Sequence, residues 1–259
     1  MKKKLIEKTS DKLVNAFLKN KLISAIPKKF SKKISNAQKF RRLCESKIDL
    51  PVAGFKAAGT GIPVMKKLKE KEPFYASIYK KNVIKSGKRV KINKSTLGIE
   101  LEVCYQVKKS FFTLKGSVTK INISRYISHI APCIEVVGYR QRKKGITSFG
   151  DLCSDFGGNV KFLIGQKKKY KKINIENLRT NITNKKINQS VDGNTNTVYI
   201  NPINSLIFVL NKVKKDKINL NKDFYVFTGS TVGVVPIKGN GLYTGKIDML
   251  GSVKAIINK

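Results

Sequence analysis

Apolar residues recur at helical spacing near the start of the chain. Two segments, residues 11–21 and 35–45, place them three and four positions apart, which is typical of one face of an amphipathic helix. Ser10 or Asp11 can cap the first helix. The two apolar stripes are Leu13, Val14, Phe17 and Leu18, and Ala37, Phe40, Leu43 and Cys44. The pattern predicts two helices within the first 50 residues.

After residue 50 the pattern changes to short apolar runs, which indicate strands. The first run covers residues 50–59 and ends in a glycine-rich loop. Further strands are expected at 75–79, 99–107, 134–138, 160–164, 197–199, 224–227, 232–235, 242–249 and 252–257. Helical spacing returns at 122–131 and 202–214. Residues 166–196 are rich in Lys and Asn, with a hairpin-like Asp192-Gly193. The sum is an α+β protein: a helical pair on a large, mostly antiparallel sheet system.

Two glutamates interrupt the apolar run at 99–107. Side chains alternate faces along a strand, so Glu100 and Glu102 share one face while their apolar neighbours point into the core. Glu135, the next acidic residue, lies in a second apolar run. Carboxylates held side by side in a half-buried strand repel each other, and a divalent cation removes that penalty. The pattern suits a hard cation such as Mg²⁺ or Mn²⁺. The alternative is a pair of edge-strand glutamates that face water beside lysines.

The formal net charge of +38 favours contact with anions, because 54 basic residues stand against 16 acidic ones. Only seven of the basic residues are Arg, and the Lys are spread over nearly the whole length. Proteins that recognise nucleic-acid bases and phosphates favour Arg, because its planar guanidinium donates two parallel hydrogen bonds. The chain is also rich in Asn and Ile, a bias that raises the Lys count without any ligand. Binding of a specific nucleic acid is therefore not expected as the main function.

The remaining composition excludes several classes of protein. The four cysteines form no Cys-x-x-Cys pair, which argues against zinc and redox motifs, and they are expected to be buried, reduced thiols. His129 is the only histidine and has no nucleophile motif nearby. No apolar stretch reaches 18 residues, and Glu7, Lys8 and Asp11 break the start of a signal peptide. We expect a cytoplasmic protein with no membrane association.

The order of short motifs resembles the 2-keto-4-pentenoate hydratase family, within the fumarylacetoacetase superfamily. The resemblance runs from about residue 10 to the end, and the order and spacing of its motifs carry it more than any single motif. The motifs are Gly54-Phe55-Lys56, Ile99-Glu100-Leu101-Glu102, Ile134-Glu135-Val136-Val137-Gly138-Tyr139-Arg140, Asp151 with Asp155, Leu163-Ile164-Gly165, Asn201-Pro202-Ile203-Asn204-Ser205, Asp223-Phe224-Tyr225-Val226-Phe227-Thr228-Gly229-Ser230, and Ile247-Asp248-Met249-Leu250-Gly251-Ser252-Val253.

This resemblance implies a β-rich roll of mixed sheets like the fumarylacetoacetase C-terminal domain. Residues 1–50 would form an N-terminal helical segment and residues 51–259 the catalytic domain. The family binds Mg²⁺ or Mn²⁺ and acts on 2-oxo acids or their dienols. The site residues that the resemblance implies are Glu100, Glu102 and Glu135 as metal ligands, Lys56 and Asp155 as catalytic residues, and Thr228 and Gly229 as substrate-binding residues.

Lys56 stands out because it is the one Lys in a small apolar strand. A desolvated Lys can lose its proton readily, or stay charged and bind a substrate carboxylate. Two positions depart from the family pattern. Phe74 follows Pro73 where the family carries an acid, and Phe156 follows Asp155 where it carries Asn. Both departures fall near the acid/base machinery that the family implies.

The resemblance thus implies a metal-dependent hydro-lyase of aromatic-compound catabolism. It would add water to a 2-hydroxy-2,4-dienoate to give a 4-hydroxy-2-oxo acid, and it would form a homo-oligomer, as family members commonly do. A 2-oxo-3-enoate decarboxylase or an acylpyruvate hydrolase on the same metal site is the nearest alternative. A non-enzymatic protein that binds polyanions through its surface lysines is a more distant one.

Overall fold

The computed structural model describes residues 2–142, 148–171 and 173–258. The larger sheet has the strand order β3-β2-β13-β6-β7-β9-β4, with β10 paired to β7 off this path. Its strands are β2 (Val52–Ala58), β3 (Phe74–Tyr79), β4 (Val83–Lys85), β6 (Thr96–Val107), β7 (Ile127–Gly138), β9 (Asn159–Ile164), β10 (Lys168–Lys169) and β13 (Phe224–Ser230).

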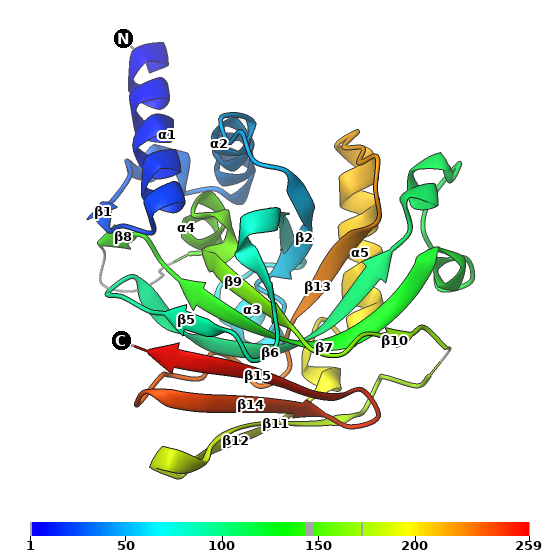
Figure 1. Cartoon of the computed structure of the whole chain (residues 1–259). Coiled ribbons are helices and arrows are strands. Elements are labelled where there is room, and N and C mark those ends of the chain that lie inside the picture. Colours follow the sequence, from blue (N-terminus) through cyan, green and yellow to red (C-terminus); the bar gives the residue numbers. More distant parts are fainter. Residues whose placement is uncertain (1, 143–147, 172, 259) are drawn as a thin grey trace.

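A second sheet of five strands lies beneath the first in Figure 1. Its order is β12-β11-β14-β15-β5, and it is mixed, because β15 runs antiparallel to β14 and parallel to β5. Its strands are β5 (Arg89–Lys91), β11 (Arg179–Asn184), β12 (Gln189–Asn194), β14 (Gly241–Ile247) and β15 (Gly251–Asn258). A two-residue parallel pair joins β1 (Ile23–Ser24) to β8 (Gln141–Arg142).

The main core fills the space between the two sheets. Ile99, Leu101 and Val103 on β6 are fully buried, as the alternation along this strand predicts. A Cβ atom on Gly245 of β14 would lie 2.6 Å from Leu101 Cδ1, so a larger residue there would displace the Leu101 side chain. One face of β6 therefore builds the core and leaves the opposite face for the two glutamates.

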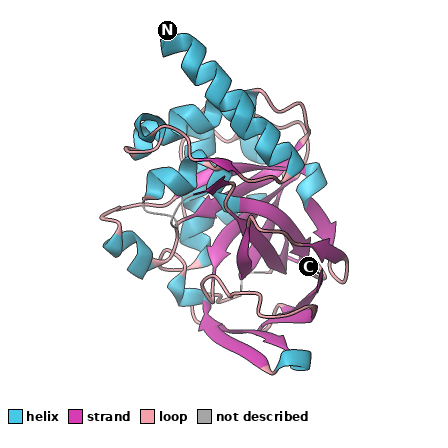
Figure 2. Ribbon diagram, turned by 90° about the vertical axis from the view of Figure 1, so that its left-hand side faces the viewer, coloured by secondary structure: helices cyan, strands magenta, loops and turns pink. Residues whose placement is uncertain are grey.

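The helices gather mainly at one side of the sheets (Figure 2). They are α1 (Lys2–Lys19), α2 (Ile34–Ser46), α3 (Ile62–Lys67), α4 (Phe149–Ser154) and α5 (Pro202–Lys215). Short 3₁₀-helices span Lys28–Phe30, Lys80–Asn82, Lys109–Thr113, Ile123–Tyr126, Phe156–Gly158, Lys185–Ile187 and Thr195–Thr197. Phe17 of α1 and Phe40 of α2 belong to one buried cluster with Tyr79 and Phe156, so the N-terminal helices pack directly on the body of the molecule.

The predicted α+β class and β-rich roll are confirmed, and most predicted elements are present. The expected helix at 122–131 is wrong: only one 3₁₀ turn forms, and β7 begins at Ile127. The expected strands at 197–199 and 232–235 are absent from the described residues. The turn expected at Asp192-Gly193 lies instead at Lys185–Ile187, where Asn188 adopts a left-handed conformation. The division at residue 50 stays a prediction.

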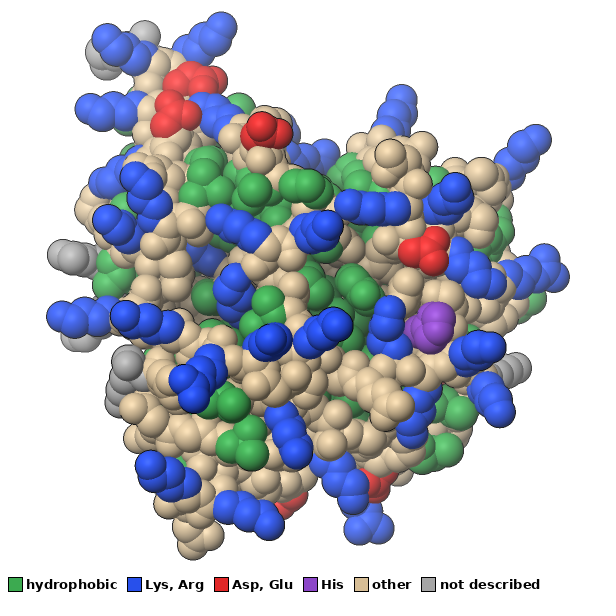
Figure 3. Space-filling model, in the orientation of Figure 1, with side chains coloured by type: hydrophobic (Ala, Val, Ile, Leu, Met, Phe, Trp, Pro, Cys, Tyr) green, Lys and Arg blue, Asp and Glu red, His purple; other side chains and the backbone are tan. Residues whose placement is uncertain are grey.

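Surface charge and buried thiols agree with the composition. Lys and Arg side chains are scattered over the whole visible face of the molecule, with few acidic ones between them (Figure 3). All four cysteines are buried and free. None of the helices in the described residues combines the length and the apolarity that a membrane span needs.

Candidate metal centre

The register of β6 and β7 brings the three predicted metal ligands together. Glu100 lies directly opposite Glu135 on the antiparallel neighbour, and Glu102 lies two residues along, opposite Cys133. One carboxylate oxygen from each glutamate lies within 4.8 Å of the others. Like charges directly opposite each other destabilise a sheet, so this arrangement calls for a compensating charge.

Burial makes the negative charge of this cluster costly. Glu102 and Glu135 are fully buried and Glu100 is partly buried. Burial raises the pKa of Glu100 to about 7, and the charge of Glu135 contributes to the rise. Burial also raises the pKa of Glu102 to about 7, although the charge of Lys56 opposes the rise. Burial also raises the pKa of Glu135 well above the ordinary value for a carboxyl, although Lys56 opposes the rise.

Lys56 is the positive partner of the cluster. Its Nζ donates to both carboxylate oxygens of Glu135, at 2.5 and 2.7 Å, and to the carbonyl of Gly157 at 3.1 Å. Burial alone would lower the pKa of Lys56, but the nearby carboxylates, Glu135 first, raise it above the ordinary value. The amine is therefore protonated and charged. Of the two behaviours expected for a buried Lys, loss of the proton or retention of the charge, the structure favours retention of the charge.

The sheet must curl for this contact to form. Lys56 lies on β2 and Glu135 on β7, with β13 and β6 between them. Three strand spacings in a flat sheet would separate the two backbones by about 14 Å. The side chains meet instead at hydrogen-bonding distance, so the strands converge on the face that carries the carboxylates.

The donor set fits a hard divalent cation. Three carboxylates and one ammonium leave a net charge of −2 when all four groups are ionised, which one divalent ion neutralises. Glu102 Oε2 accepts the backbone N–H of Gly229 at 2.9 Å, while its buried Oε1 has no partner among the described residues. An unpartnered buried carboxylate oxygen is costly, and a cation would satisfy it. Oxygen donors alone favour Mg²⁺ or Mn²⁺ over softer metals.

A cavity of about 620 Å³ opens beside these groups. Lys56, Glu100 and Gly229 line it, so the positive group and one of the carboxylates are within reach of a small molecule. Many of its other lining residues are apolar: Ala57, Ala58, Pro63, Val64, Leu68, Leu97, Val137, Phe149, Leu152, Val232 and Val234. Such a cavity, mainly apolar with a few converging charged groups, is typical of a small-molecule site.

Gly229 reaches the cavity, whereas Thr228 does not. Gly229 has a φ of 102°, and a Cβ atom there would lie 2.0 Å from Thr60 Oγ1. Only glycine can therefore bring its N–H to Glu102 at this bulge of β13. The Thr228 hydroxyl donates to the backbone carbonyl of Val103 at 2.9 Å and is fully buried. Its predicted contact with substrate stays a prediction, and the bonds it makes are structural.

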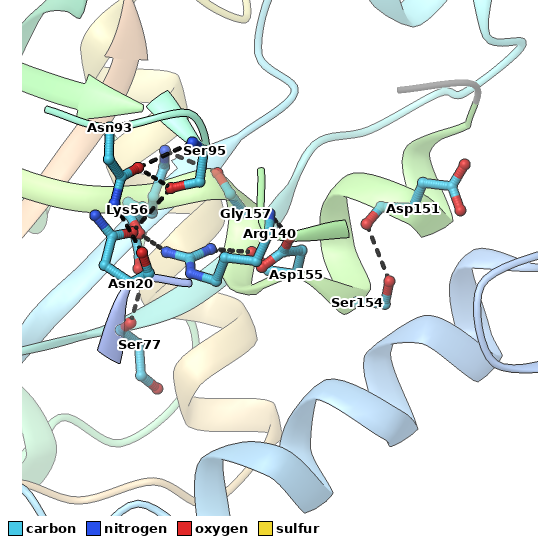
Figure 4. A network of polar contacts seen from close by, with 11 residues as sticks. Asn20, Lys56, Ser77, Asn93, Ser95, Arg140, Asp151, Ser154, Asp155 and Gly157 are labelled. Atoms are coloured by element: carbon cyan, nitrogen blue, oxygen red, sulfur yellow. Dashed lines mark hydrogen bonds and ion pairs between the residues drawn. The ribbon is translucent and has the colours of Figure 1, made fainter. Parts of the chain in front are cut away.

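Asp155 forms a buried ion pair away from the cavity lining. One carboxylate oxygen accepts from the Arg140 guanidinium at 2.6 Å and the other from the Arg140 backbone N–H at 2.6 Å (Figure 4). The two residues are almost fully buried. Asp155 does not line the cavity, so its predicted catalytic role gains no support from this geometry. The contacts indicate that it fixes the turn after β7.

The two positions that depart from the family pattern carry buried aromatic side chains. Phe74 is buried, and its ring lies 5.7 Å from that of Phe149, which lines the cavity. Phe156 is buried against Phe17, with ring centroids 4.5 Å apart. Apolar side chains therefore stand where the resemblance leads one to expect an acid and an amide.

Other cavity residues could not be found from the sequence. Gly157 accepts from Lys56 through its carbonyl, and Phe149 and Leu152 contribute the α4 wall. Backbone contacts and isolated apolar residues leave no motif, and α4 is too short for a clear helical period. Gly157 and Gly158 have φ values of 67° and 75°, so the glycine pair is the sequence signal of this turn.

Comparison with known proteins agrees with the predicted fold. No family model matches the chain, and no curated protein sequence does. Solved structures do match it over its full length. The chain has the fold of the fumarylacetoacetase superfamily, which confirms the resemblance at the level of the fold.

Two of the matching structures are of 4-oxalocrotonate decarboxylase from Pseudomonas putida G7. The complex with magnesium and adipate matches with a TM-score of 0.81 and 18% identity, over 100% of this chain and 98% of that one. The complex with calcium and acetate matches with a TM-score of 0.82 and 17% identity, over the same shares. A 2-hydroxyhepta-2,4-diene-1,7-dioate isomerase from Mycobacterium marinum matches less closely, with a TM-score of 0.51 and 13% identity, over 80% of this chain and 76% of that one.

Proposed function

We propose that the protein is a divalent-metal-dependent lyase that acts on an unsaturated 2-oxo acid or its dienol. The observation that carries the proposal is the convergence of Glu100, Glu102 and Glu135 beside the buried, charged Lys56 at a cavity of about 620 Å³. Two matching structures are complexes with magnesium or calcium, which supports a divalent metal as the cofactor.

Glu100, Glu102 and Glu135 would hold Mg²⁺ or Mn²⁺. When bound, the cation polarises the 2-oxo group of a chelating substrate and stabilises enolate charge on that oxygen. The protein's own part is to fix the ligands: Gly229 holds one oxygen of Glu102, and Lys56 holds both oxygens of Glu135. The apolar walls of the cavity exclude water from the conjugated chain of the substrate.

Lys56 would move the proton. Lys56 lines the cavity, and its Nζ is protonated and held in place by Glu135 and the Gly157 carbonyl. An ammonium in this position can give its proton to a carbon of the dienolate, and the neutral amine that remains can then take a proton from water or from a substrate carbon. General acid–base catalysis of this kind contributes about 10²–10⁴-fold to a rate.

Decarboxylation is the reaction that the cavity supports best. The bond to a carboxylate remote from the 2-oxo group breaks, CO₂ leaves, and its electron pair moves along the conjugated chain to the 2-oxo oxygen. One proton completes the product, and no water has to be activated. The resemblance leads one to expect an acid at Phe74, but Phe74 packs against Phe149, which lines the cavity, so the wall on this side is apolar. The name of the full-length structural match supports the same choice.

Hydration of a 2-hydroxy-2,4-dienoate, which the sequence favours, is the second candidate. Asp192 and Thr197 line the cavity and offer polar groups that can hold a water molecule. Both candidates pass through a dienol or its enolate, so they share the metal site and Lys56. They differ only in whether a carbon–carbon bond breaks or water adds.

An assay of three substrate classes separates the candidates. A 2-oxo-3-enedioate, a 2-hydroxy-2,4-dienoate and an acylpyruvate are supplied with Mg²⁺ or Mn²⁺, and ultraviolet absorbance and CO₂ release are followed. We expect consumption of the enedioate with stoichiometric CO₂. Water addition to the dienoate without CO₂ would establish hydration instead, and cleavage of the acylpyruvate alone would establish the hydrolase.

Glu102→Gln supplies the matched test of the metal site. The amide keeps an oxygen to accept the Gly229 N–H but removes the charge, so we expect a folded protein with turnover at least about 100-fold lower. Glu70→Gln, outside the cavity lining, serves as the control and should leave turnover unchanged. If no substrate is consumed and the protein instead binds RNA with a steep salt dependence, the polyanion-binding alternative replaces this proposal.

A further inference from the structure

A second cavity, of about 290 Å³, lies where the end of α1 meets β5 and β9. It shares no lining residue with the cavity at the candidate metal centre. Its lining includes Phe17, Lys81, Arg89, Lys91, Arg140 and Lys161. No acidic residue is among the residues that line it. Its volume is about ten times that of one water molecule in the liquid, which is ample for one small anion.

Four of the five cations around this cavity have no counterions in the described part of the chain. Lys81, Arg89, Lys91 and Lys161 form none of the ion pairs found there. A high Lys content alone would place lysines near any cavity. Arg is scarce in this chain, however, and two of its seven arginines line this one. Composition therefore does not account for the cluster.

Arg140 adds a buried donor that is still available. Its terminal nitrogens bind Asp155 and the backbone carbonyl of Asn159, so Asp155 compensates its charge. Its Nε has no partner among the described residues, although the side chain is only 1% exposed. Leaving a buried donor unsatisfied costs roughly 1–3 kcal/mol, so an acceptor in the cavity would relieve this cost.

Asn82 adds a buried acceptor at the same cavity. Its side-chain nitrogen donates to the carbonyl of Val160 at 2.7 Å, and its Oδ1 has no partner in the described structure. A ligand that carries both negative oxygens and one hydroxyl would satisfy the cations, the Arg140 Nε and this oxygen together. Hydrogen phosphate has that combination, whereas sulfate lacks the hydroxyl.

The cations also repel one another. Lys161 Nζ donates to the backbone carbonyl of Lys81 at 2.7 Å, which places the two lysines side by side. Burial lowers the pKa of Lys161, and the charge of Lys81 lowers it further. Lys81 and Arg140 both lie against the ring of Phe17, with the charged group 5.8 and 4.9 Å from its centre. An anion between them would replace repulsion with attraction.

We propose that this cavity binds free hydrogen phosphate. Lys81, Lys161, Arg89 and Lys91 supply the charge, Arg140 Nε donates a hydrogen bond, and Asn82 accepts one. Arg binds phosphate oxygens through its planar fork, and Lys binds them as a point charge.

Calorimetric titration at constant ionic strength, balanced with sodium chloride, tests this site. Inorganic phosphate, phenyl phosphate and sulfate are titrated into the full chain. We expect saturable binding of phosphate at one site per chain, with sulfate at least about tenfold weaker because it cannot donate to Asn82. At pH 7.5 phenyl phosphate is a dianion without a hydroxyl, so it should bind as weakly as sulfate. Phenyl phosphate binding as tightly as phosphate would overturn the assignment to hydrogen phosphate. Phosphate and sulfate binding alike, or no saturation, would overturn the proposal.

Two double variants distinguish the site from general surface charge. Arg89→Gln/Lys91→Gln removes two exposed cations that line the cavity, and we expect phosphate affinity to fall at least tenfold. Lys222→Gln/Lys238→Gln removes the same charge at exposed positions elsewhere and should change the affinity less than twofold. Equal losses in the two variants would show that phosphate is held by the overall charge alone, and would overturn the site.

Discussion

Lys56 donates to both carboxylate oxygens of Glu135 inside the larger sheet, at 2.5 and 2.7 Å. The two side chains come from strands separated by two others, and both are almost fully buried. A buried ion pair of this kind contributes little net stability, but removal of one partner leaves an uncompensated charge. Here the remaining charge would belong to a cluster of three carboxylates, so the pair couples the proposed acid/base group to the proposed metal ligands.

Replacement of Lys56 by Met separates turnover from metal binding. Met fills a similar volume without charge, so three carboxylates remain with a net charge of −3 when ionised. We expect turnover to fall at least about 100-fold because the proton donor is lost. The affinity for Mn²⁺, followed by calorimetry, should stay equal or rise, because the competing cation is gone.

Lys222→Met is the control for this variant, because Lys222 is exposed and lies outside the cavity. It should leave both turnover and affinity unchanged. Stability is compared in urea with Mg²⁺ present, so that a partly unfolded Lys56 variant is recognised. Normal turnover in Lys56→Met would remove Lys56 from the proposed chemistry.

The stability of chelator-treated protein should fall as the pH rises. Burial raises the pKa of Glu102 from 4.5 to about 7, and the pKa of Glu100 shifts in the same direction to about 7. Between pH 4.5 and about pH 7 the folded protein binds more protons than the unfolded chain. The free energy of unfolding therefore decreases with increasing pH over this range. For Glu102 alone the loss is on the order of 3 kcal/mol.

Divalent metal should reverse this trend, because it binds the deprotonated carboxylates. Thermal unfolding is followed at pH 5.5 and pH 8, with chelator and with saturating Mg²⁺. The gain in melting temperature from Mg²⁺ is expected to be larger at pH 8. A gain of the same size at both values, or no gain at all, would argue against metal binding by these glutamates.

Gly229 should not tolerate a side chain. In Gly229→Ala the new Cβ atom would meet Thr60 within 2.0 Å at a φ of 102°, and the N–H that holds Glu102 would shift. We expect a loss of roughly 2–4 kcal/mol in the free energy of unfolding, measured in urea, together with weaker Mn²⁺ binding. Gly233→Ala is the matched control, since Gly233 has a φ of 72° but no atom within 4 Å of the new Cβ. Its loss should stay near 1 kcal/mol, and equal losses would show that close approach is not the reason for glycine at 229.

Asp155→Asn tests whether this residue is catalytic or structural. Loss of the charge leaves Arg140 buried without its counterion, so we expect the free energy of unfolding to fall by about 3 kcal/mol. Turnover per folded molecule, corrected by the denaturation curve, should change less than threefold. A large loss of turnover at unchanged stability would restore the catalytic role that the sequence predicts.

The fold could be predicted where the chain carries long apolar patterns or an ordered series of motifs. The alternation around Leu101 placed the glutamates on the correct face, and α2 and α5 follow their helical stripes closely. The expected helix at 122–131 is wrong because Ile127 and Ile130 lie three residues apart, a spacing that also occurs on one face of a helix. In the structure they pair as part of β7, because contact with β6 outweighs the weak local preference.

The site could be predicted in its charged residues but not in its contacts. Lys56 and the three glutamates are rare types in their surroundings, so the sequence singled them out. Nothing in the sequence shows that Thr228 bonds to Val103 or that Asp155 faces Arg140, since these contacts join distant segments. The apolar cavity wall depends on Phe149, which no local pattern connects with Phe74.

The most direct test of the metal centre is the anomalous scattering of crystals soaked in MnCl₂. We predict one strong peak between β6 and β7, with an oxygen of Glu100, Glu102 and Glu135 each at about 2.0–2.3 Å, the usual range for hard divalent cations. A strong peak elsewhere, with none at these three glutamates under saturating Mn²⁺, would contradict the account.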